Sequence, residues 1–359
     1  MDFGWGGPAW VAVPPSEMKN CFALMSARGG DGVEVWACLE EAEMDCQFSQ
    51  KGTGPGARSS HAITVVGDKA YAFGGEFTPR VPVDNNLHVF DLETSTWSIS
   101  AATGDIPTPR VGVTMASVGT TLYVFGGRDA DHQELDEFYA FDTLTNTWTR
   151  IPGDGPPNRS YHSMAADERR VYVFGGCGVS GRLNDLWAYD TVARAWDACP
   201  APGEACRGRG GTGLVVVEGK VWVVYGFAGE EVDDVHAFDV EKRTWERVET
   251  GGEKPSARSV FCAARVGRRV VVFGGEVDPS EEGHLGAGRF SGEAYALDTE
   301  TRMWARAAEG EKGEHHPGAR GWCAYAGAVR DGKEGLIVYG GNSPSNDRLD
   351  DIYFFEPRL

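Results

Sequence analysis

The chain has 359 residues, of which 41% are hydrophobic, and its 53 acidic residues outnumber its 34 basic ones to give a formal net charge of −19. This balance argues against nucleic acids and anionic membranes as partners, because proteins bind both largely through lysine and arginine. The sequence has no apolar run of about 18 residues that could cross a membrane, and its start, MDFGWGGPAWVAVPP, lacks the basic and apolar regions of a signal peptide. It therefore predicts a cytoplasmic protein, with the nucleus open as a second compartment.

The eight cysteines show neither a CxxC pair nor the paired spacing of zinc ligands. Free thiols in a reducing compartment are the expected state. Cys199 and Cys206 could in principle pair or hold a metal ion, but no nearby histidine or second cysteine pair supports a site there.

The first predicted element is a strand at residues 10–13, WVAV, within an N-terminal segment 1–13. Residues 14–51 follow and fit no repeat. We expect this segment to be an insertion, either a flexible surface excursion or an artefact of the gene model.

From residue 52 onward the chain is repetitive. Short apolar runs end in a double glycine, or a relic of one, at residues 71–75, 123–127, 172–176, 223–227, 271–275 and 337–341. Each of the first five is followed by an aromatic-rich run that ends in Asp, with a Trp six residues later. These pairs are Asp91 and Trp97, Asp142 and Trp148, Asp190 and Trp196, Asp239 and Trp245, and Asp298 and Trp304.

The repeat predicts strands joined by tight turns. Runs of β-branched and aromatic residues favour strands, glycines permit the positive φ of a tight turn, and stretches such as DTLTNTW supply a polar turn before the outer strand. The pattern resembles the kelch motif over residues 58–359, and this resemblance implies an all-β, six-bladed propeller over residues 52–359 in which each Trp packs between blades. The sixth copy stops after residues 351–356, so we expect residues 10–13 to supply its outer strand and close the ring.

In such a blade, the loop before the innermost strand and the loop after the double glycine lie on the same rim. The residues placed after the glycines are Glu76, Arg128, Cys177, Glu276 and Asn342. The arginines placed before the innermost strands are Arg58, Arg110, Arg159, Arg207, Arg258 and Arg320. We expect most of these arginines to pair with backbone carbonyls and carboxylates between blades.

One rim loop is longer than the others. From the first glycine to the Asp of the same repeat there are 17, 16, 15 and 13 residues in the first four copies, and 24 in the fifth. The added residues lie in FGGEVDPSEEGHLGAG, residues 273–288, and loops that outgrow their scaffold often carry function. A solvated acidic loop is the simpler interpretation.

The glycines of GHLGAG allow the backbone to fold back, so that Glu276 and His284 could meet on one ion. A set of carboxylate and imidazole ligands suits Fe(II), Mn(II) or Zn(II). Arg128, which follows the glycines in FGGRD, is the cation expected beside the central opening, where it could bind an anionic group. Tyr161 and Trp322 lie just before the innermost strands of their repeats. They either belong to the site or cap the hydrophobic core.

Several stretches narrow the resemblance: FGGRDA, GKVWVVYGFAGEEVDDVH, FGGEVDPSEEGHLGAG and RGWCAY. They are similar to the plant specifier proteins of glucosinolate breakdown, namely the nitrile-specifier, epithiospecifier and thiocyanate-forming proteins. The resemblance implies a lyase that acts on the thiohydroximate-O-sulfate released by a thioglucosidase and directs it to nitriles, with Fe(II) as cofactor. The expected substrate is thus a small anionic molecule.

The family pattern places its iron ligands at Glu276, Ser280 and His284. The middle position, a carboxylate in the family, is Ser280 here, and a neutral hydroxyl binds a hard divalent ion much more weakly. Asp278 or Glu281 could supply a carboxylate from a shifted position. The resemblance also implies that Arg128 binds the sulfate and that Tyr161 and Trp322 pack the substrate side chain.

The alternative function is a non-catalytic propeller whose rim binds protein partners, since the fold alone does not fix the function. A ubiquitin-ligase adaptor is not expected, because no BTB, BACK or F-box segment is recognisable. A copper oxidase is not expected either, because its Tyr, Cys and His set is not recognisable.

Overall fold

The computed structural model describes residues 21–26, 33–38, 45–308 and 316–357. The chain divides into two compact units, Met1–Met44 and Asp45–Leu359. The described part of the first unit is an antiparallel hairpin of β1 (Cys21–Ser26) and β2 (Val33–Cys38). The segment predicted as an insertion thus contains paired strands.

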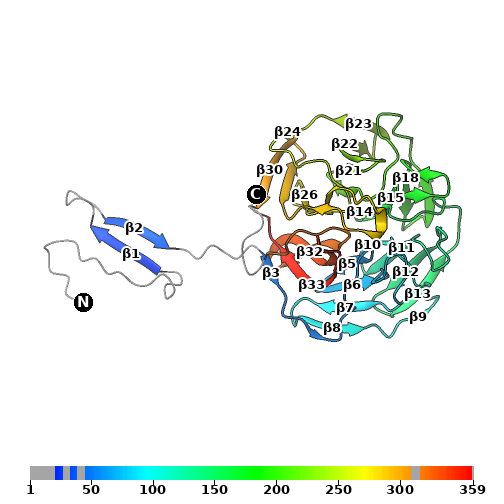
Figure 1. Cartoon of the computed structure of the whole chain (residues 1–359), viewed down its shortest axis with the longest axis horizontal. Coiled ribbons are helices and arrows are strands. Elements are labelled where there is room, and N and C mark those ends of the chain that lie inside the picture. The colour runs from blue at the N-terminus through cyan, green and yellow to red at the C-terminus, as the bar shows by residue number, and fades with distance from the viewer. Residues whose placement is uncertain (1–20, 27–32, 39–44, 309–315, 358–359) are drawn as a thin grey trace. The chain divides into compact units, whose positions relative to one another are not determined.

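The second unit is a six-bladed β-propeller, as predicted (Figure 1). Its innermost strands contact one another in chain order, and the last contacts the first, so the ring is closed. From the inner strand outward, blade one consists of β5 (Ala62–Val66), β6 (Lys69–Phe73), β7 (His88–Asp91), β8 (Thr96–Ile99) and β4 (Lys51–Gly52). Blade two consists of β10 (Thr114–Val118), β11 (Thr121–Phe125), β12 (Phe138–Asp142), β13 (Thr147–Ile151) and β9 (Thr103–Gly104). Blade three consists of β14 (Ser163–Ala166), β15 (Arg170–Phe174), β18 (Leu186–Asp190) and β19 (Ala195–Ala198).

Blades four to six follow the same plan. Blade four consists of β20 (Gly213–Val217), β21 (Lys220–Phe227), β22 (Glu231–Asp239) and β23 (Thr244–Val248). Blade five consists of β25 (Cys262–Val266), β26 (Arg269–Phe273), β29 (Ala294–Asp298), β30 (Met303–Ala308) and β24 (Gly251–Gly252). Blade six consists of β31 (Ala324–Arg330), β32 (Lys333–Asn342), β33 (Arg348–Phe355) and β3 (Asp45–Gln47). Two short hairpins stand on the rim, β16 (Cys177–Gly178) with β17 (Gly181–Arg182), and β27 (Glu276–Asp278) with β28 (Arg289–Phe290). Within the described residues no helix is long and apolar enough to span a bilayer.

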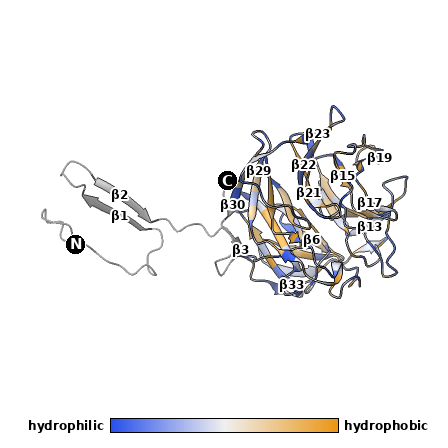
Figure 2. Cartoon of the chain, turned by 45° about the horizontal axis from the view of Figure 1, so that its top comes forward, coloured by the Kyte–Doolittle hydropathy of each residue, from blue (hydrophilic) through white to orange (hydrophobic). Residues whose placement is uncertain are grey.

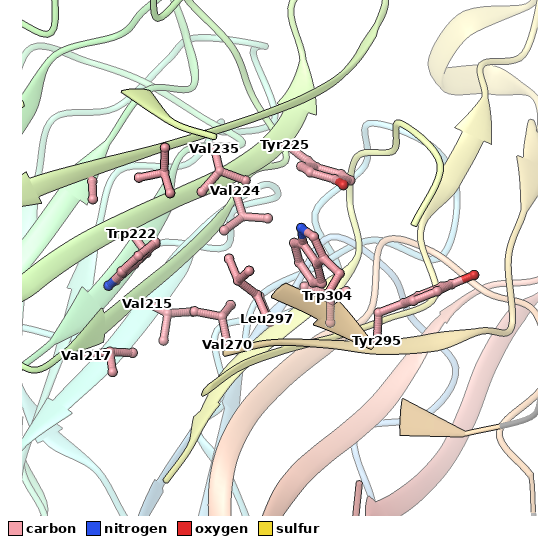
Figure 3. Packing of buried hydrophobic residues seen from close by; sticks show 14 of the residues in the cluster. Val215, Val217, Trp222, Val224, Tyr225, Val235, Val270, Tyr295, Leu297 and Trp304 are labelled. Atoms are coloured by element: carbon pink, nitrogen blue, oxygen red, sulfur yellow. The ribbon is translucent and has the colours of Figure 1, made fainter. Parts of the chain in front are cut away.

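The repeated tryptophans pack between blades, as predicted. Each contacts an aromatic ring on the second strand of the preceding blade, and the pairs are Trp97 with Tyr339, Trp148 with Phe73, Trp196 with Phe125, Trp245 with Phe174 and Trp304 with Tyr225. Figure 3 shows one such interface, where Trp304 lies beside Leu297 and Tyr225. Apolar residues concentrate in the strands and hydrophilic residues in the loops (Figure 2). The core is therefore the set of spaces between sheets.

The arginines that precede the innermost strands are structural, as expected, but their partners lie within their own blade and not between blades. Each is buried and donates to the carbonyl of the first residue of the double-glycine pair, which is Tyr225 in blade four and a glycine in the other blades. These arginines are Arg58, Arg110, Arg159, Arg209, Arg258 and Arg320. In blade four the sequence analysis assigned this position to Arg207, but the structure places Arg209 there. Arg209 is fully buried and pairs with Asp234, whereas Arg207 is exposed and pairs with Glu230.

The outer strand of blade six comes from the N-terminal side of the propeller, but from a different segment than predicted. Residues 10–13 lie outside the described residues, and the position proposed for them is taken by β3 (Asp45–Gln47), which pairs with β33. Phe48 continues this contact, because its N–H donates to the carbonyl of Ile352 at 3.0 Å and its ring meets Phe90 edge-on at 5.1 Å. Residues 45–51, assigned to the insertion above, thus belong to the propeller.

Candidate functional site

One cavity of about 340 Å³ opens on the rim that carries the double-glycine loops. Its wall comes from one equivalent position in each blade, the residue after the double glycine, which forms a bridge to the loop before the innermost strand of the same blade. These wall residues are Glu76, Arg128, Cys177, Phe227, Glu276 and Asn342. The sequence placed all of them except Phe227 on this rim.

The floor of the cavity is a closed ring of backbone hydrogen bonds. One residue per blade donates its N–H to the carbonyl of its counterpart in the preceding blade, at 2.8–3.1 Å, and all of them have φ between 48° and 60°. The ring members are Ser60, Gly112, Tyr161, Gly211, Val260 and Trp322. Because only two of these positions carry large aromatic side chains, Tyr161 and Trp322 dominate the floor, and they meet edge-on at 5.5 Å.

Gly112 makes room for Tyr161. A Cβ at Gly112 would lie 2.8 Å from the ring of Tyr161, whereas a Cβ at Gly119, which has nearly the same φ, would have nothing within 4 Å. Both Gly→Ala variants must adopt a left-handed backbone, but only Gly112→Ala also displaces the ring. We expect Gly112→Ala to lower the free energy of unfolding by about 1–3 kcal/mol more than Gly119→Ala, measured by denaturant titration. Equal losses would show that the ring does not lie against this position.

Arg128 lies at the cavity, but it is not the isolated cation that the sequence suggested. Its Nε donates to Glu134 Oε1 at 3.1 Å, and a terminal nitrogen also contacts this buried carboxylate. Its guanidinium carbon is 6.0 Å from the centre of the Tyr161 ring. The other terminal nitrogen, Nη1, makes no hydrogen bond within the described residues. Its N–H groups therefore remain available to donate to an anion.

Two ionisable side chains near Arg128 stay protonated. Burial, reinforced by the charge of Glu76, raises the pKa of the Tyr161 phenol far above its usual value. Burial likewise raises the pKa of the Cys177 thiol. Tyr161 is therefore a hydrogen-bond donor and Cys177 a neutral wall residue, and neither is suited to act as a base or a nucleophile at neutral pH.

Glu276 stands in the long loop of blade five and lines the same cavity. Its side chain is only 7% exposed, and its Oε1 accepts the N–H of Gly288 at 3.1 Å. A Cβ at Gly288 would lie 2.1 Å from that oxygen, so a glycine is required where the loop folds back. Asn346 of blade six donates to the carbonyl of Leu285 at 3.1 Å and ties the loop to its neighbour.

The other predicted metal ligands are distributed along this loop. Ser280 lines the cavity, and its hydroxyl accepts the N–H of Glu282 at 3.1 Å. Asp278 and Glu281 are exposed. His284 lies in the 3-10 turn η2 (Gly283–Leu285), and the position of its side chain lies outside what the structure describes. Among the described residues, no three His, Cys, Asp or Glu side chains are placed together so that they could hold a metal ion.

The sequence interpretation missed several charged residues at the site, including Arg182 and Glu231. Arg182, in β17 opposite Cys177 of β16, lines the cavity with its guanidinium carbon 4.5 Å from the centre of the Phe227 ring. Glu231 begins β22 beside the loop of blade five. Burial, together with the charges of Glu276 and Asp278, raises the pKa of Glu231 to about 8 despite a hydrogen bond from Ser259. The acidic residues of FAGEEVDD, residues 227–234, are visible in the sequence. Their side-chain directions could not be predicted, because this stretch has no counterpart in the other repeats.

The wall residues place opposite charges on opposite sides of the cavity. Arg128 belongs to blade two and Glu276 to blade five, three blades away in a ring of six. Tyr161 and Trp322 lie on the floor between them. A ligand that spans the opening could thus contact a cation at one end, a carboxylate at the other and aromatic rings beneath.

Comparison with known proteins agrees with this description. A family model described as the KLHDC2/KLHL20/DRC7 Kelch-repeats domain matches residues 60–275. The N-(sulfonatooxy)prop-2-enimidothioate sulfolyase of Thlaspi arvense is 44% identical over 327 residues, which cover 84% of this chain and 93% of that protein.

More distant relatives share the repeat. Kelch domain-containing protein 3 of Bos taurus is 30% identical over 64% of this chain and 64% of its own length. A solved structure titled "Structure of YjhT" superposes with a TM-score of 0.67 at 16% identity, covering 83% of this chain and 95% of that one. At this identity the likeness concerns the fold alone.

Proposed function

This chain belongs to the family of kelch-repeat specifier proteins, and we propose that it is a lyase that directs thiohydroximate-O-sulfates, the aglucones of glucosinolates, to simple nitriles with Fe(II) as cofactor. The name of the Thlaspi arvense relative describes such a molecule, an imidothioate with a sulfonatooxy group on nitrogen. The observation that carries the proposal is the opposition of Arg128 and Glu276 across one cavity.

The cavity offers binding groups for each part of this substrate. The sulfate is an anion, and Arg128 Nη1 and the Arg182 guanidinium are two of the arginine groups lining the cavity that can donate hydrogen bonds to its oxygens. The apolar side chain of the substrate packs on Tyr161 and Trp322, whose rings form the floor. The net charge of −19 repels the substrate at long range, so recognition depends on these short-range contacts.

The reaction requires two bonds to break without a base or a nucleophile from the protein. The N–O bond breaks and sulfate leaves with the electron pair, while the electrons of the C–S bond become the third bond of the nitrile and sulfur is released. Arg128 and Arg182 stabilise the charge that collects on the departing sulfate. The protonated Tyr161 and Cys177 leave the carbon unattacked.

Glu276 and the loop of blade five are the part of the cavity suited to Fe(II). Iron supplies, when bound, a Lewis acid for the thiolate sulfur. Glu276 is buried, faces the cavity and offers a hard oxygen ligand, and His284 follows in the same loop. Among the described residues of this loop, Glu276 brings a carboxylate and Ser280 a hydroxyl to the cavity.

Ser280→Asp is expected to strengthen Fe(II) binding. An aspartate can accept the N–H of Glu282 as Ser280 does, and it adds a charged oxygen ligand at the position where the family pattern has a carboxylate. Anaerobic calorimetry should show a lower dissociation constant for Fe(II) in this variant than in the wild type. If neither protein binds Fe(II), the metal part of the proposal fails.

Product analysis in the presence and absence of a chelator tests the proposed reaction. Digestion of a glucosinolate by thioglucosidase with the protein and Fe(II) should yield nitrile, and a chelator should return the product to isothiocyanate. Added Fe(II) should then restore the nitrile. Nitrile formation that is unchanged by the chelator would contradict the role of iron and leave the lyase activity intact.

A further inference from the structure

A second carboxylate stands beside Glu276, and it comes from a different blade. Glu231 is the first residue of β22 in blade four and is paired with Phe227 of the cavity wall. Ser259 connects the two carboxylates: its hydroxyl donates to Glu231 Oε1 at 3.1 Å, and its backbone exchanges two hydrogen bonds of 2.9 Å with Glu276. One residue thus fixes both acidic residues at the junction of blades four and five.

The second oxygen of Glu231 has no hydrogen-bond partner among the residues that the structure describes. Oε2 is buried and makes no hydrogen bond within the described part of the chain. The charges of Glu276 and Asp278 act on this carboxylate in addition to its burial. Two carboxylates held together away from water repel each other, and a buried carboxylate oxygen that lacks a donor is costly. A divalent cation between Glu231 and Glu276 would remove both costs.

We propose that Glu231 supplies the carboxylate that Ser280 lacks, so that the metal ion is bound across two blades by Glu231 and Glu276. This inference rests on the Fe(II) dependence proposed above. Ser280 offers a neutral hydroxyl that already accepts the N–H of Glu282. Glu281 is exposed, whereas Glu231 has a buried and uncommitted oxygen. Two carboxylates are the ligand charge that a hard divalent ion favours.

The test is metal binding to the full chain, with Mn(II) as a probe that resists oxidation and Fe(II) under anaerobic conditions. Calorimetry gives the dissociation constant, and the electron paramagnetic resonance signal of free Mn(II) gives an independent value. Glu231→Gln removes the charge and keeps the shape. It is expected to weaken Mn(II) binding by about tenfold or more, since even the loss of an outer partner of a metal site has an effect of this size.

Glu230→Gln is the matched control. Glu230 precedes Glu231 and carries the same charge, but it is exposed and pairs with Arg207. This variant should bind Mn(II) as the wild type does. Glu231→Gln combined with Ser280→Asp should recover affinity, because a carboxylate returns at the position where the family pattern has one. Thermal unfolding without added metal at neutral pH should show that Glu231→Gln is about as stable as the wild type, since a carboxyl with a pKa of about 8 is mostly neutral there and a glutamine is neutral as well.

The outcomes separate the inference from the proposed function. If Glu231→Gln binds Mn(II) as tightly as the wild type while Glu276→Gln does not, the metal site exists but Glu231 is no part of it, and the inference is overturned. If the wild type binds neither Mn(II) nor Fe(II), the proposed cofactor itself is wrong. Glu231→Gln could unfold at a lower temperature than the wild type, and Ser259→Ala then gives a second test. Ser259→Ala removes the hydrogen bond that orients Glu231 but keeps the carboxylate, and it must weaken Mn(II) binding for the inference to stand.

Discussion

Arg128→Ala is expected to reduce nitrile formation by roughly tenfold or more, because a charge-assisted hydrogen bond to an anion contributes about 1.5–3 kcal/mol. Arg128→Lys should recover only part of the loss, since an ammonium keeps the charge but lacks the planar fork that grips two sulfate oxygens. The measurement is the rate of nitrile formation at a fixed supply of aglucone.

This experiment needs a control for Glu134. The carboxylate of Glu134 is buried against Arg128, so Arg128→Ala leaves it without its cation and can destabilise the wall. The double variant Arg128→Ala with Glu134→Gln removes the cation without stranding a charge. It should unfold near the wild-type temperature and still lose nitrile formation. Wild-type nitrile formation in this double variant would disprove the sulfate role of Arg128.

Deleting residues 1–48 is expected to destabilise the propeller by at least about 3 kcal/mol, the lower end of the loss seen when a buried Phe is removed. The deletion strips β3 from β33, which exposes a sheet edge, and it removes Phe48, which is 3% exposed and packs on Phe90. Denaturant unfolding of the truncated chain measures the loss.

A shorter deletion, of residues 1–44, separates the closing strand from the segment before it. It keeps β3 and Phe48, so the free energy of unfolding should stay close to that of the whole chain. Equal destabilisation by both deletions would show that residues before Asp45 contribute to the closure. Unchanged stability of the longer deletion would show that blade six does not need an outer strand.

The repeat made most of the fold predictable. Each Trp follows an Asp at a fixed distance, and each lies between blades against an aromatic residue of the preceding one. The closing strand was misplaced because β3 is three residues long, DCQ, and has no alternating pattern, whereas WVAV at 10–13 has higher β-propensity. Connectivity to blade one and the burial of Phe48 determine which segment closes the ring.

The candidate site was predictable where it follows the repeat and not elsewhere. Arg128 and Glu276 occupy equivalent positions after the double glycines, so the period alone placed them on one rim. The pairing of Arg128 with Glu134 and the position of Glu231 depend on the conformation of loops that differ from blade to blade. Periodicity carries no information about such loops.

The product ratio of a glucosinolate digest tests the lyase function most directly. A glucosinolate is digested by thioglucosidase in the presence of Fe(II) and increasing amounts of the protein, and nitrile and isothiocyanate are quantified by gas chromatography. The nitrile fraction should rise with protein concentration while the sum of the two products stays constant. A digest that yields only isothiocyanate at every protein concentration would contradict the lyase function and favour a propeller that binds protein partners.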